Sequence, residues 1–243
     1  MSHKIIGRNP VLEAIKSGRD IDKIFIKKGK PEGSLLPLIR KARDAKIVIS
    51  DCDKAKLDEL ANGENHQGVI AFVSETQYKT LDDIIEYANK KNEAPIVVVC
   101  DRITDPHNLG AIIRTSECAG AHGVIIPKRS GAPVNEVVSK TSAGAVEHMN
   151  ICKVTNISRT IDELKERGFW ITGAHMNGKP MYEIDFKGSV GIVIGNEGEG
   201  ISRLVSEKCD FYASIPMYGN VNSLNASVAA GVLLYEIVRQ RNS

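Results

Sequence analysis

The feature that most constrains the fold of this chain is an uninterrupted apolar run, Ile96-Val97-Val98-Val99-Cys100. A strand with one face in water alternates apolar and polar residues, whereas a strand covered on both faces has no need to alternate. Since β-branched residues dominate the run, we interpret it as an interior strand of a sheet that is packed on both sides. Such strands are typical of parallel sheets, whose crossover helices lie on both faces.

Helical patterns and further strand candidates alternate after this run. Strands alternating with helices predict an α/β domain with a mostly parallel sheet, which we expect to span residues 93–243. The strand candidates are 123–126, 169–172, 190–194 and 212–215, and the helix candidates are 108–121, 135–146 and 223–241.

Residues 1–74 show shorter elements of both kinds and predict a separate, small α/β domain. A polar stretch that contains one short helix, residues 75–92, is predicted to link the two domains. In the small domain the strand candidates are 23–27, 47–49 and 68–73, and the helix candidates are 9–17, 34–45 and 53–61.

Positive charge is concentrated at the start of the chain. Residues 1–50 carry twelve Lys or Arg and five Asp or Glu, although the whole chain has a formal net charge of only +2. A basic part of this kind suits a polyanion such as RNA, and the alternative is a solvated lysine-rich surface. In the RNA interpretation these side chains bind phosphates and position the RNA without selecting its sequence. The candidate phosphate contacts are Arg8, Lys27, Lys28, Arg40 and Lys41.

The five cysteines are scattered and form no CxxC pair. This spacing argues against a disulfide framework and against a zinc site, so we expect no metal and a reducing, cytoplasmic compartment. No apolar run reaches the roughly 18 residues of a membrane helix, and the N-terminus does not look like a signal peptide.

Three segments rich in glycine, asparagine and acidic residues lie where predicted strands end. In parallel α/β sheets ligands bind at the carboxyl ends of the strands, so these segments predict a site. The first, residues 105–115, contains Asn108 and places Arg114 inside an apolar stretch. Taken alone, Arg114 could equally pair with a carboxylate at the edge of the core.

The second segment, residues 191–202, combines glycines with Glu197 and Glu199. Its glycine spacing is neither GxGxxG nor a Walker loop, and two carboxylates suit a cationic or hydroxyl-rich ligand better than a pyrophosphate. The third, residues 215–227, gathers five Asn and Ser side chains before the last helix, more than helix capping requires. The simpler alternatives are a tight turn and a helix cap.

The order and spacing of three motifs resemble the SpoU/TrmH branch of the SPOUT RNA methyltransferases. The motifs are NLGAIIRT (108–115), IVIGNEGEGIS (192–202) and IPMYGNVNSLNASVAAG (215–231). The stretches IIGRNPVLEAI (5–15) and NHQGV (65–69) are similar to the substrate-binding domain of RlmB-type members, so the resemblance covers nearly the whole chain.

The resemblance implies a C-terminal SPOUT domain with a parallel sheet and a trefoil knot, preceded by an N-terminal RNA-binding domain. It also implies S-adenosylmethionine as cofactor, a homodimer, and methylation of a ribose 2′-hydroxyl, with a 23S rRNA guanosine as the expected target and tRNA as the alternative. The matching catalytic positions are Arg114, Asn108, Glu197, Ser223 and Asn225. The matching cofactor positions are Thr172, Gly173, Ala174, Gly195, Asn196, Gly198, Ile215, Met217, Ser223 and Leu224.

A guanidinium stays protonated in proteins, so we expect Arg114 to act as a fixed cation and not as a base. Two other classes of function compete with the enzyme. A non-catalytic RNA-binding or assembly factor is disfavoured because Arg114, Glu197 and Asn225 are all present. An NAD-dependent oxidoreductase is disfavoured because the GxGxxG motif is absent.

Overall fold

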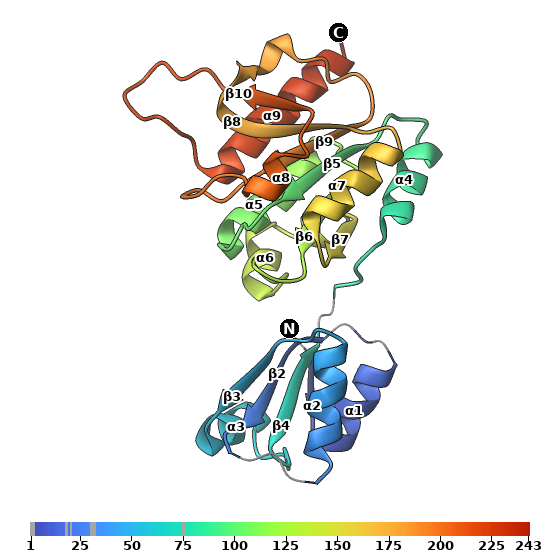
Figure 1. Ribbon diagram of the computed structural model, residues 1–243, viewed down its shortest axis with the longest axis vertical. Coiled ribbons are helices and arrows are strands. Elements are labelled where there is room, and N and C mark those ends of the chain that lie inside the picture. Colours follow the sequence, from blue (N-terminus) through green and yellow to red (C-terminus); the bar gives the residue numbers. More distant parts are fainter. Residues whose placement is uncertain (1–2, 18, 20, 30–32, 74–75) are drawn as a thin grey trace. The chain divides into compact units, whose positions relative to one another are not determined.

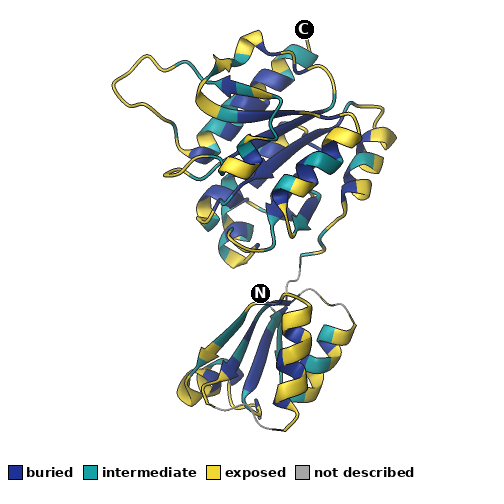
Figure 2. Ribbon diagram, in the orientation of Figure 1, coloured by how far each residue is buried: buried dark blue, intermediate teal, exposed yellow. Residues whose placement is uncertain are grey.

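The computed structural model describes residues 3–17, 19, 21–29, 33–73 and 76–243, and the chain divides into two compact units. The first unit is residues 1–75 and the second is residues 76–243 (Figure 1). Each unit has its own apolar core, formed where both faces of its sheet meet the helices (Figure 2).

The first unit is a four-stranded sheet with helices on both faces. Strand β4 runs antiparallel to both of its neighbours, and β2 and β3 are parallel. Helices α1 and α2 pack on one face around Ile24 and Leu38, and α3 packs on the other around Leu57. In sheet order the strands are β1 (His3–Ile6), β4 (Val69–Val73), β2 (Ile21–Lys27) and β3 (Ile49–Cys52), and the helices are α1 (Arg8–Lys16), α2 (Leu35–Asp44) and α3 (Lys54–Ala61).

The second unit is built on six parallel strands. Strand β5, the apolar run, lies between β9 and β6, and all five of its residues are buried. The prediction of an interior strand in a parallel sheet is therefore confirmed. In sheet order the strands are β10 (Phe211–Ser214), β8 (Trp170–Pro180), β9 (Val190–Ile194), β5 (Ile96–Cys100), β6 (Gly123–Pro127) and β7 (Ile151–Val154).

Helices cover both faces of this sheet, as the apolar run of β5 requires. Val98 packs with α5 and α9 on one side, and Val97 packs with α4 and α7 on the other. On the first face lie α5 (Pro106–Cys118), α6 (Glu136–Thr141) and α9 (Ala226–Arg241); on the second lie α4 (Leu81–Lys90), α7 (Ile157–Glu166) and α8 (Arg203–Ser206). Two 3₁₀ turns, Ala145–Glu147 and Met181–Glu183, complete the unit.

The structure differs from the sequence-based expectation in the segment 75–92. Helix α4 begins at a full capping box between Thr80 and Asp83, and it buries Leu81 and Ile84 in the core of the second unit. Most of this segment is therefore an integral part of that unit, because its apolar face packs on the sheet. Residues 74–75 at the predicted boundary lie outside the described residues.

Other differences concern where helices end. The helix predicted over 135–146 stops at Thr141, since Ala143 and Gly144 adopt positive φ angles of 51° and 84°. Helix α9 begins at Ala226, because Asn225 caps it. The sequence analysis also missed β1, β7 and α7.

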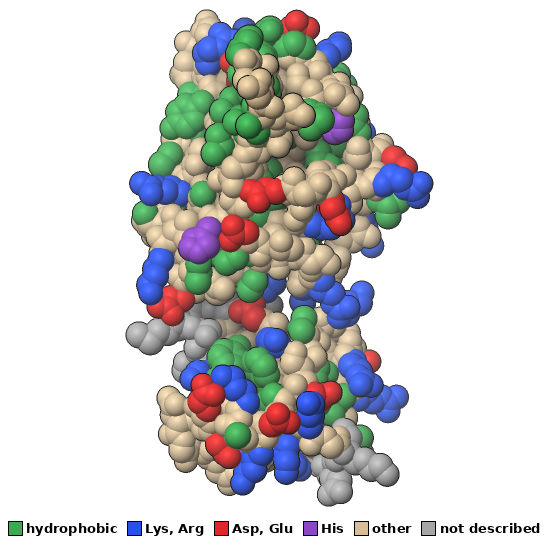
Figure 3. Space-filling view, turned by 90° about the vertical axis from the view of Figure 1, so that its left-hand side faces the viewer, with side chains coloured by type: hydrophobic (Ala, Val, Ile, Leu, Met, Phe, Trp, Pro, Cys, Tyr) green, Lys and Arg blue, Asp and Glu red, His purple; other side chains and the backbone are tan. Residues whose placement is uncertain are grey.

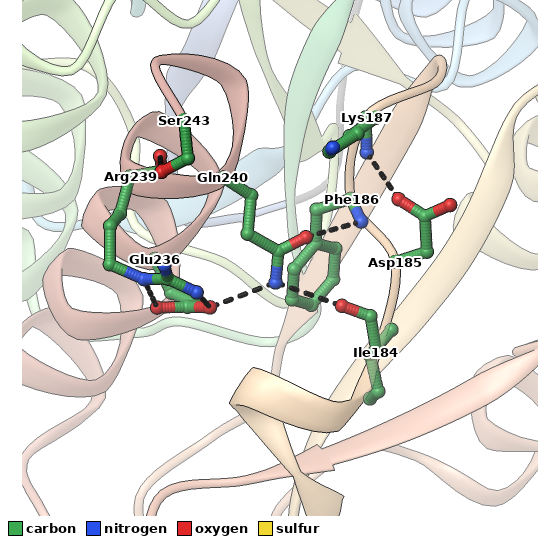
Figure 4. Close-up of polar contacts among 8 residues, drawn as sticks. All are labelled: Ile184, Asp185, Phe186, Lys187, Glu236, Arg239, Gln240 and Ser243. Carbon is green, nitrogen blue, oxygen red and sulfur yellow. Dashed lines mark hydrogen bonds and ion pairs between the residues drawn. The ribbon is translucent and has the colours of Figure 1, made fainter.

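The C-terminal half of α9 is tied to the segment before β9 (Figure 4). The Phe186 N–H donates to Gln240 Oε1 over 2.9 Å, and Gln240 Nε2 donates to Ile184 O over 2.9 Å and to Glu236 Oε1 over 2.8 Å. Arg239 holds the same carboxylate with two hydrogen bonds of 2.8 Å. These bonds hold the C-terminal half of α9 against the segment before β9.

Candidate functional site

A cavity of about 830 Å³ opens at the carboxyl ends of β9 and β10 and beside the middle of β8. This is the edge of a parallel sheet at which ligands are expected. The cavity is lined by residues 174–176, 194–200, 213–217, 219, 222–224, 226 and 229.

The loop after β9 forms one wall of the cavity and folds back on itself. Asn196 and Gly200 exchange two backbone hydrogen bonds of 3.0 and 2.8 Å, and Asn196 Oδ1 accepts the Gly198 N–H over 2.9 Å. A Cβ atom at Gly195 would overlap the backbone of Gly200 and Ile201, so only glycine fits there. The main chain of this loop is thereby presented directly to the cavity.

A second set of bonds joins this loop to the end of β5. Asn196 Nδ2 donates to Arg102 O over 3.1 Å, and Arg102 Nη1 pairs with Glu199 Oε2 at 2.6 Å. The Ser202 N–H donates to Asp101 Oδ2 over 2.6 Å. Glu199 is therefore neutralised by Arg102, while Glu197 has no cationic partner within the part of the chain that the structure describes.

Strand β8 supplies another wall through an interruption of its pairing with β10. The ladder includes Thr172 and Gly173 and resumes only at Lys179, so residues 174–178 lie outside it. Within this stretch His175 stacks edge-to-face on Tyr212 at 5.6 Å and accepts the Asn177 N–H at Nδ1. The sequence analysis did not place His175 or Met176 at the cavity, because an interrupted ladder leaves no periodic signal.

The three predicted segments meet in a cluster of Asn108, Glu197 and Asn225, called here the Asn–Glu–Asn cluster. Asn108 Nδ2 donates to Glu197 Oε1 over 2.9 Å, and Asn225 Nδ2 donates both to Asn108 Oδ1 over 2.9 Å and to Glu197 Oε1. Glu197 lines the cavity, and Asn225 lies between the lining residues Leu224 and Ala226. The cluster thus adjoins the cavity. Of the polar side chains gathered before α9, Asn225 both caps the helix and donates hydrogen bonds to Asn108 and Glu197.

Most of the predicted cofactor residues also line the cavity, whereas Thr172 and Gly173 lie in the β8 ladder and do not. Arg114 is exposed on α5, does not line the cavity, and makes no hydrogen bond or ion pair with any described residue. The alternative of a carboxylate partner at the core edge therefore finds no support. The predicted residues that line the cavity are Ala174, Gly195, Asn196, Glu197, Gly198, Ile215, Met217, Ser223 and Leu224.

The thiols that burial affects most are poor nucleophiles. Burial raises the pKa of Cys100 and of Cys209 to about 12 and that of Cys152 to about 11, so each stays protonated at neutral pH. All five cysteines are free. Among the described helices, none is long and apolar enough to cross a membrane.

Comparison with known proteins assigns the chain to a family. Residues 95–235 match the SpoU rRNA methylase family, and residues 4–79 match the substrate-binding domain of RNA 2′-O ribose methyltransferases. The chain belongs to the SpoU/TrmH family. Members of this family are S-adenosylmethionine-dependent RNA methyltransferases, so the expected fold class, enzyme class and cofactor are confirmed.

Relatives of this family match over nearly their whole length. A Staphylococcus aureus protein assigned to the TrmH family of tRNA/rRNA methyltransferases is 46% identical over 98% of this chain and 96% of its own length. The Bacillus subtilis relative YacO, assigned to the same family, is 44% identical over the same shares.

Two solved structures show the same fold. The SpoU methyltransferase AviRb from Streptomyces viridochromogenes, crystallised with S-adenosylmethionine, is 27% identical with a TM-score of 0.63, over 99% of this chain and 91% of AviRb. The TrmH/SpoU tRNA-modifying enzyme of A. aeolicus is 33% identical with a TM-score of 0.57, over 62% of this chain and 77% of its own.

Proposed function

We propose that this member of the family methylates the ribose 2′-hydroxyl of a guanosine in 23S rRNA, in the cytoplasm. The observation that carries the ribose assignment is the Asn–Glu–Asn cluster, which holds a carboxylate beside the cavity. The match of residues 4–79 to substrate-binding domains of 2′-O ribose methyltransferases supports the same target group. The choice of guanosine and of 23S rRNA rests on the resemblance to RlmB-type members.

The cavity fits S-adenosylmethionine. Its volume of about 830 Å³ lies in the range of small-molecule sites, roughly 300–1,000 Å³. Ile215 and Leu224 give apolar walls, the glycine loop offers main-chain groups, and the unpaired Glu197 carboxylate suits a positively charged ligand. When bound, the cofactor supplies a methyl group activated by a sulfonium centre. The residues that would hold it are Ala174, Gly195, Asn196, Gly198, Ile215, Met217, Ser223 and Leu224.

Glu197 has one oxygen left for the substrate. Both amides of the cluster donate to Oε1, and Oε2 accepts no hydrogen bond from the described residues, so it stays available as an acceptor. We assign Oε2 the task of orienting the ribose hydroxyl and accepting its proton as the new carbon–oxygen bond forms, after which the proton passes to solvent. The proton-accepting group is thus a carboxylate and not Arg114.

Arg114 supplies positive charge in this proposal. A guanidinium can clamp a phosphate through two parallel hydrogen bonds and stabilise negative charge that develops on the hydroxyl oxygen. Because Arg114 is exposed on α5 and does not line the cavity of its own chain, we infer that bound RNA or a second copy of the chain supplies its partners. We therefore retain the homodimer as part of the proposal.

The first unit would hold the RNA through its exposed cations. Figure 3 shows Lys and Arg side chains of this unit on the face turned to the viewer, interleaved with carboxylates. Lys27, Arg40 and Lys41 are exposed, and Lys28 lies 3.9 Å from Asp53. Arg8 differs from them in having an evident structural role: its Nε donates to Gln67 O over 2.9 Å.

Mapping of 2′-O-methyl positions in total RNA from cells with and without this protein tests the proposal. Loss of one guanosine methylation in 23S rRNA is the expected result. Loss of a tRNA methylation would move the substrate to tRNA, the second candidate, on which the A. aeolicus neighbour acts. An unchanged map, together with RNA binding by the pure protein, would indicate a non-catalytic assembly factor instead.

A further inference from the structure

The orientation of the Asn225 amide follows from the start of α9. Its Oδ1 accepts the backbone N–H of Ser227 over 2.9 Å and that of Val228 over 3.4 Å. Because a backbone N–H can only donate, this side of the amide must be the oxygen. Ser227 Oγ adds the shortest of the three bonds to the same oxygen, 2.6 Å.

This orientation determines the rest of the Asn–Glu–Asn cluster. With its oxygen engaged at the helix, Asn225 must direct Nδ2 at Asn108 Oδ1 and at Glu197. Asn108 then has only its own Nδ2 to offer, and it donates to Glu197 Oε1. The orientation of the Asn225 amide therefore determines on which side the Glu197 carboxylate receives the amide hydrogen bonds, and it leaves the other oxygen without an amide donor.

From these contacts we infer that Ser227 is a positioning residue, which acts through Asn225 to fix the reactive orientation of Glu197. This inference rests on the proposed function. The Ser227 side chain is half-buried, and its hydroxyl has one donor hydrogen, which it gives to the Asn225 oxygen. Without that hydroxyl the amide keeps two backbone donors, one of them long, so that flipped and displaced rotamers become more populated.

The competing interpretation is that Ser227 only strengthens the cap of α9. A cap contributes to stability, whereas a positioning residue changes the rate of the chemical step in molecules that are folded. Measuring kcat per folded molecule separates the two roles, because a loss of stability alone leaves this quantity unchanged. The RNA KM and the Kd for S-adenosylmethionine are measured alongside it.

The experiment compares Ser227→Ala with Ser227→Thr, which retains the hydroxyl. The assay is transfer of radiolabelled methyl from S-adenosylmethionine to RNA, and circular dichroism gives the folded fraction at the assay temperature. For Ser227→Ala we expect kcat per folded molecule to fall about tenfold, the effect of one charge-neutral hydrogen bond, with both KM and Kd within about twofold of wild type. Ser227→Thr should recover most of the rate.

Two further variants make the test specific. Asn225→Asp still caps α9 but cannot donate to Asn108 or Glu197, so adding Ser227→Ala to it should cause no further loss of rate. Thr80→Ala removes the comparable capping hydroxyl of α4, away from the cavity, and should lower stability without changing kcat.

The outcomes distinguish this inference from the proposed function. If the wild-type protein transfers no methyl to RNA ribose, the proposed function fails. If the wild type is active and Ser227→Ala keeps its kcat per folded molecule, the positioning role is overturned. It is equally overturned if the alanine variant loses rate independently of Asn225→Asp, or loses cofactor binding instead of rate.

Discussion

Asn225 at the start of α9 donates a 2.9 Å hydrogen bond to Asn108 in the first turn of α5, 117 residues earlier in the chain. This bond links the two helices that pack side by side on one face of the sheet, at the end where the cavity opens. Since both amides also reach Glu197, the carboxylate is held by two helices and not by its own loop alone.

Glu197→Gln should keep the hydrogen bonds of the cluster but present a donor to the substrate in place of an acceptor. The glutamine oxygen can still accept from Asn108 and Asn225, whereas an NH₂ group would replace Oε2 and could no longer accept a proton. We expect kcat to fall about 100-fold while the Kd for S-adenosylmethionine changes little. Calorimetry and a methyl-transfer assay measure the two quantities, and a kcat near that of wild type would exclude Glu197 as the proton acceptor.

Gly195→Ala should disrupt the cavity wall. Its Cβ would collide with the backbone of Gly200 and Ile201, so the loop would have to move, at a cost of about 1–3 kcal/mol or more. We expect a lower melting temperature and cofactor binding at least tenfold weaker. Gly188→Ala is the matched control, because a Cβ at Gly188 meets nothing within 4 Å. Equal behaviour of the two variants would contradict the close packing.

Arg114→Lys tests whether geometry or charge alone matters. Lysine keeps the positive charge but cannot form the two parallel bonds of a guanidinium. Since Arg114 is exposed and makes no hydrogen bond or ion pair with a described residue, stability should not change. We expect methyl transfer to fall about 100-fold with unchanged cofactor affinity. Retention of most of the activity would show that Arg114 contributes only its charge.

His122 should make the second unit less stable in mild acid. The ring is buried, Nδ1 accepts the Ile96 N–H over 3.0 Å, and burial lowers the pKa of the imidazole despite the hydrogen bond with Glu93. The unfolded chain therefore takes up a proton on His122 near pH 6.5 while the folded chain stays neutral, and stability falls as the pH drops below about 6.5.

Urea unfolding followed by the fluorescence of Trp170, the single tryptophan, measures this effect within the second unit. His122→Asn keeps an acceptor for Ile96 but does not titrate. It should be less stable than wild type at pH 7.5 and lose less stability between pH 7.5 and 5.5. An equal loss in both proteins would place the acid sensitivity elsewhere.

Binding of RNA should depend steeply on salt, with the first unit as the source. Each phosphate contact that is lost lowers the slope of log K against log[salt] by about 0.7–0.9. We expect Arg40→Glu with Lys41→Glu to weaken RNA binding and flatten this slope without changing cofactor affinity. The same reversal at Lys90, exposed on α4, serves as the control. A slope that the double variant leaves unchanged would remove Arg40 and Lys41 from the RNA surface.

The sequence predicted the fold of the second unit well because its signal is local. An apolar run such as 96–100 indicates a buried strand even when the helices that cover it are not known. The interruption of the β8–β10 ladder after Gly173 and the lack of room for a Cβ atom at Gly195 both depend on the neighbouring backbone. A single sequence does not show where that backbone lies. Helix α4 was assigned to a linker because its apolar face is short, and only its packing shows that it belongs to the core.

The site was predicted in part for the same reason. Asn108, Glu197 and Asn225 were each identified from motifs, but their mutual hydrogen bonds arise from parallel strands whose ends meet at one edge. Arg114 follows Asn108 by six residues in the same motif and on the same helix, α5, yet its side chain is exposed and does not line the cavity.

The central pairing of the sheet has a consequence for biosynthesis. Strand β5 lies between β6, which follows it closely, and β9, which emerges roughly ninety residues later. At translation rates of about 5–20 residues per second, one edge of β5 waits for its partner for about 5–20 seconds. During that interval an apolar strand edge is open on the nascent chain, so slower elongation or a missing chaperone should reduce the yield of this protein before any change in its finished stability becomes visible.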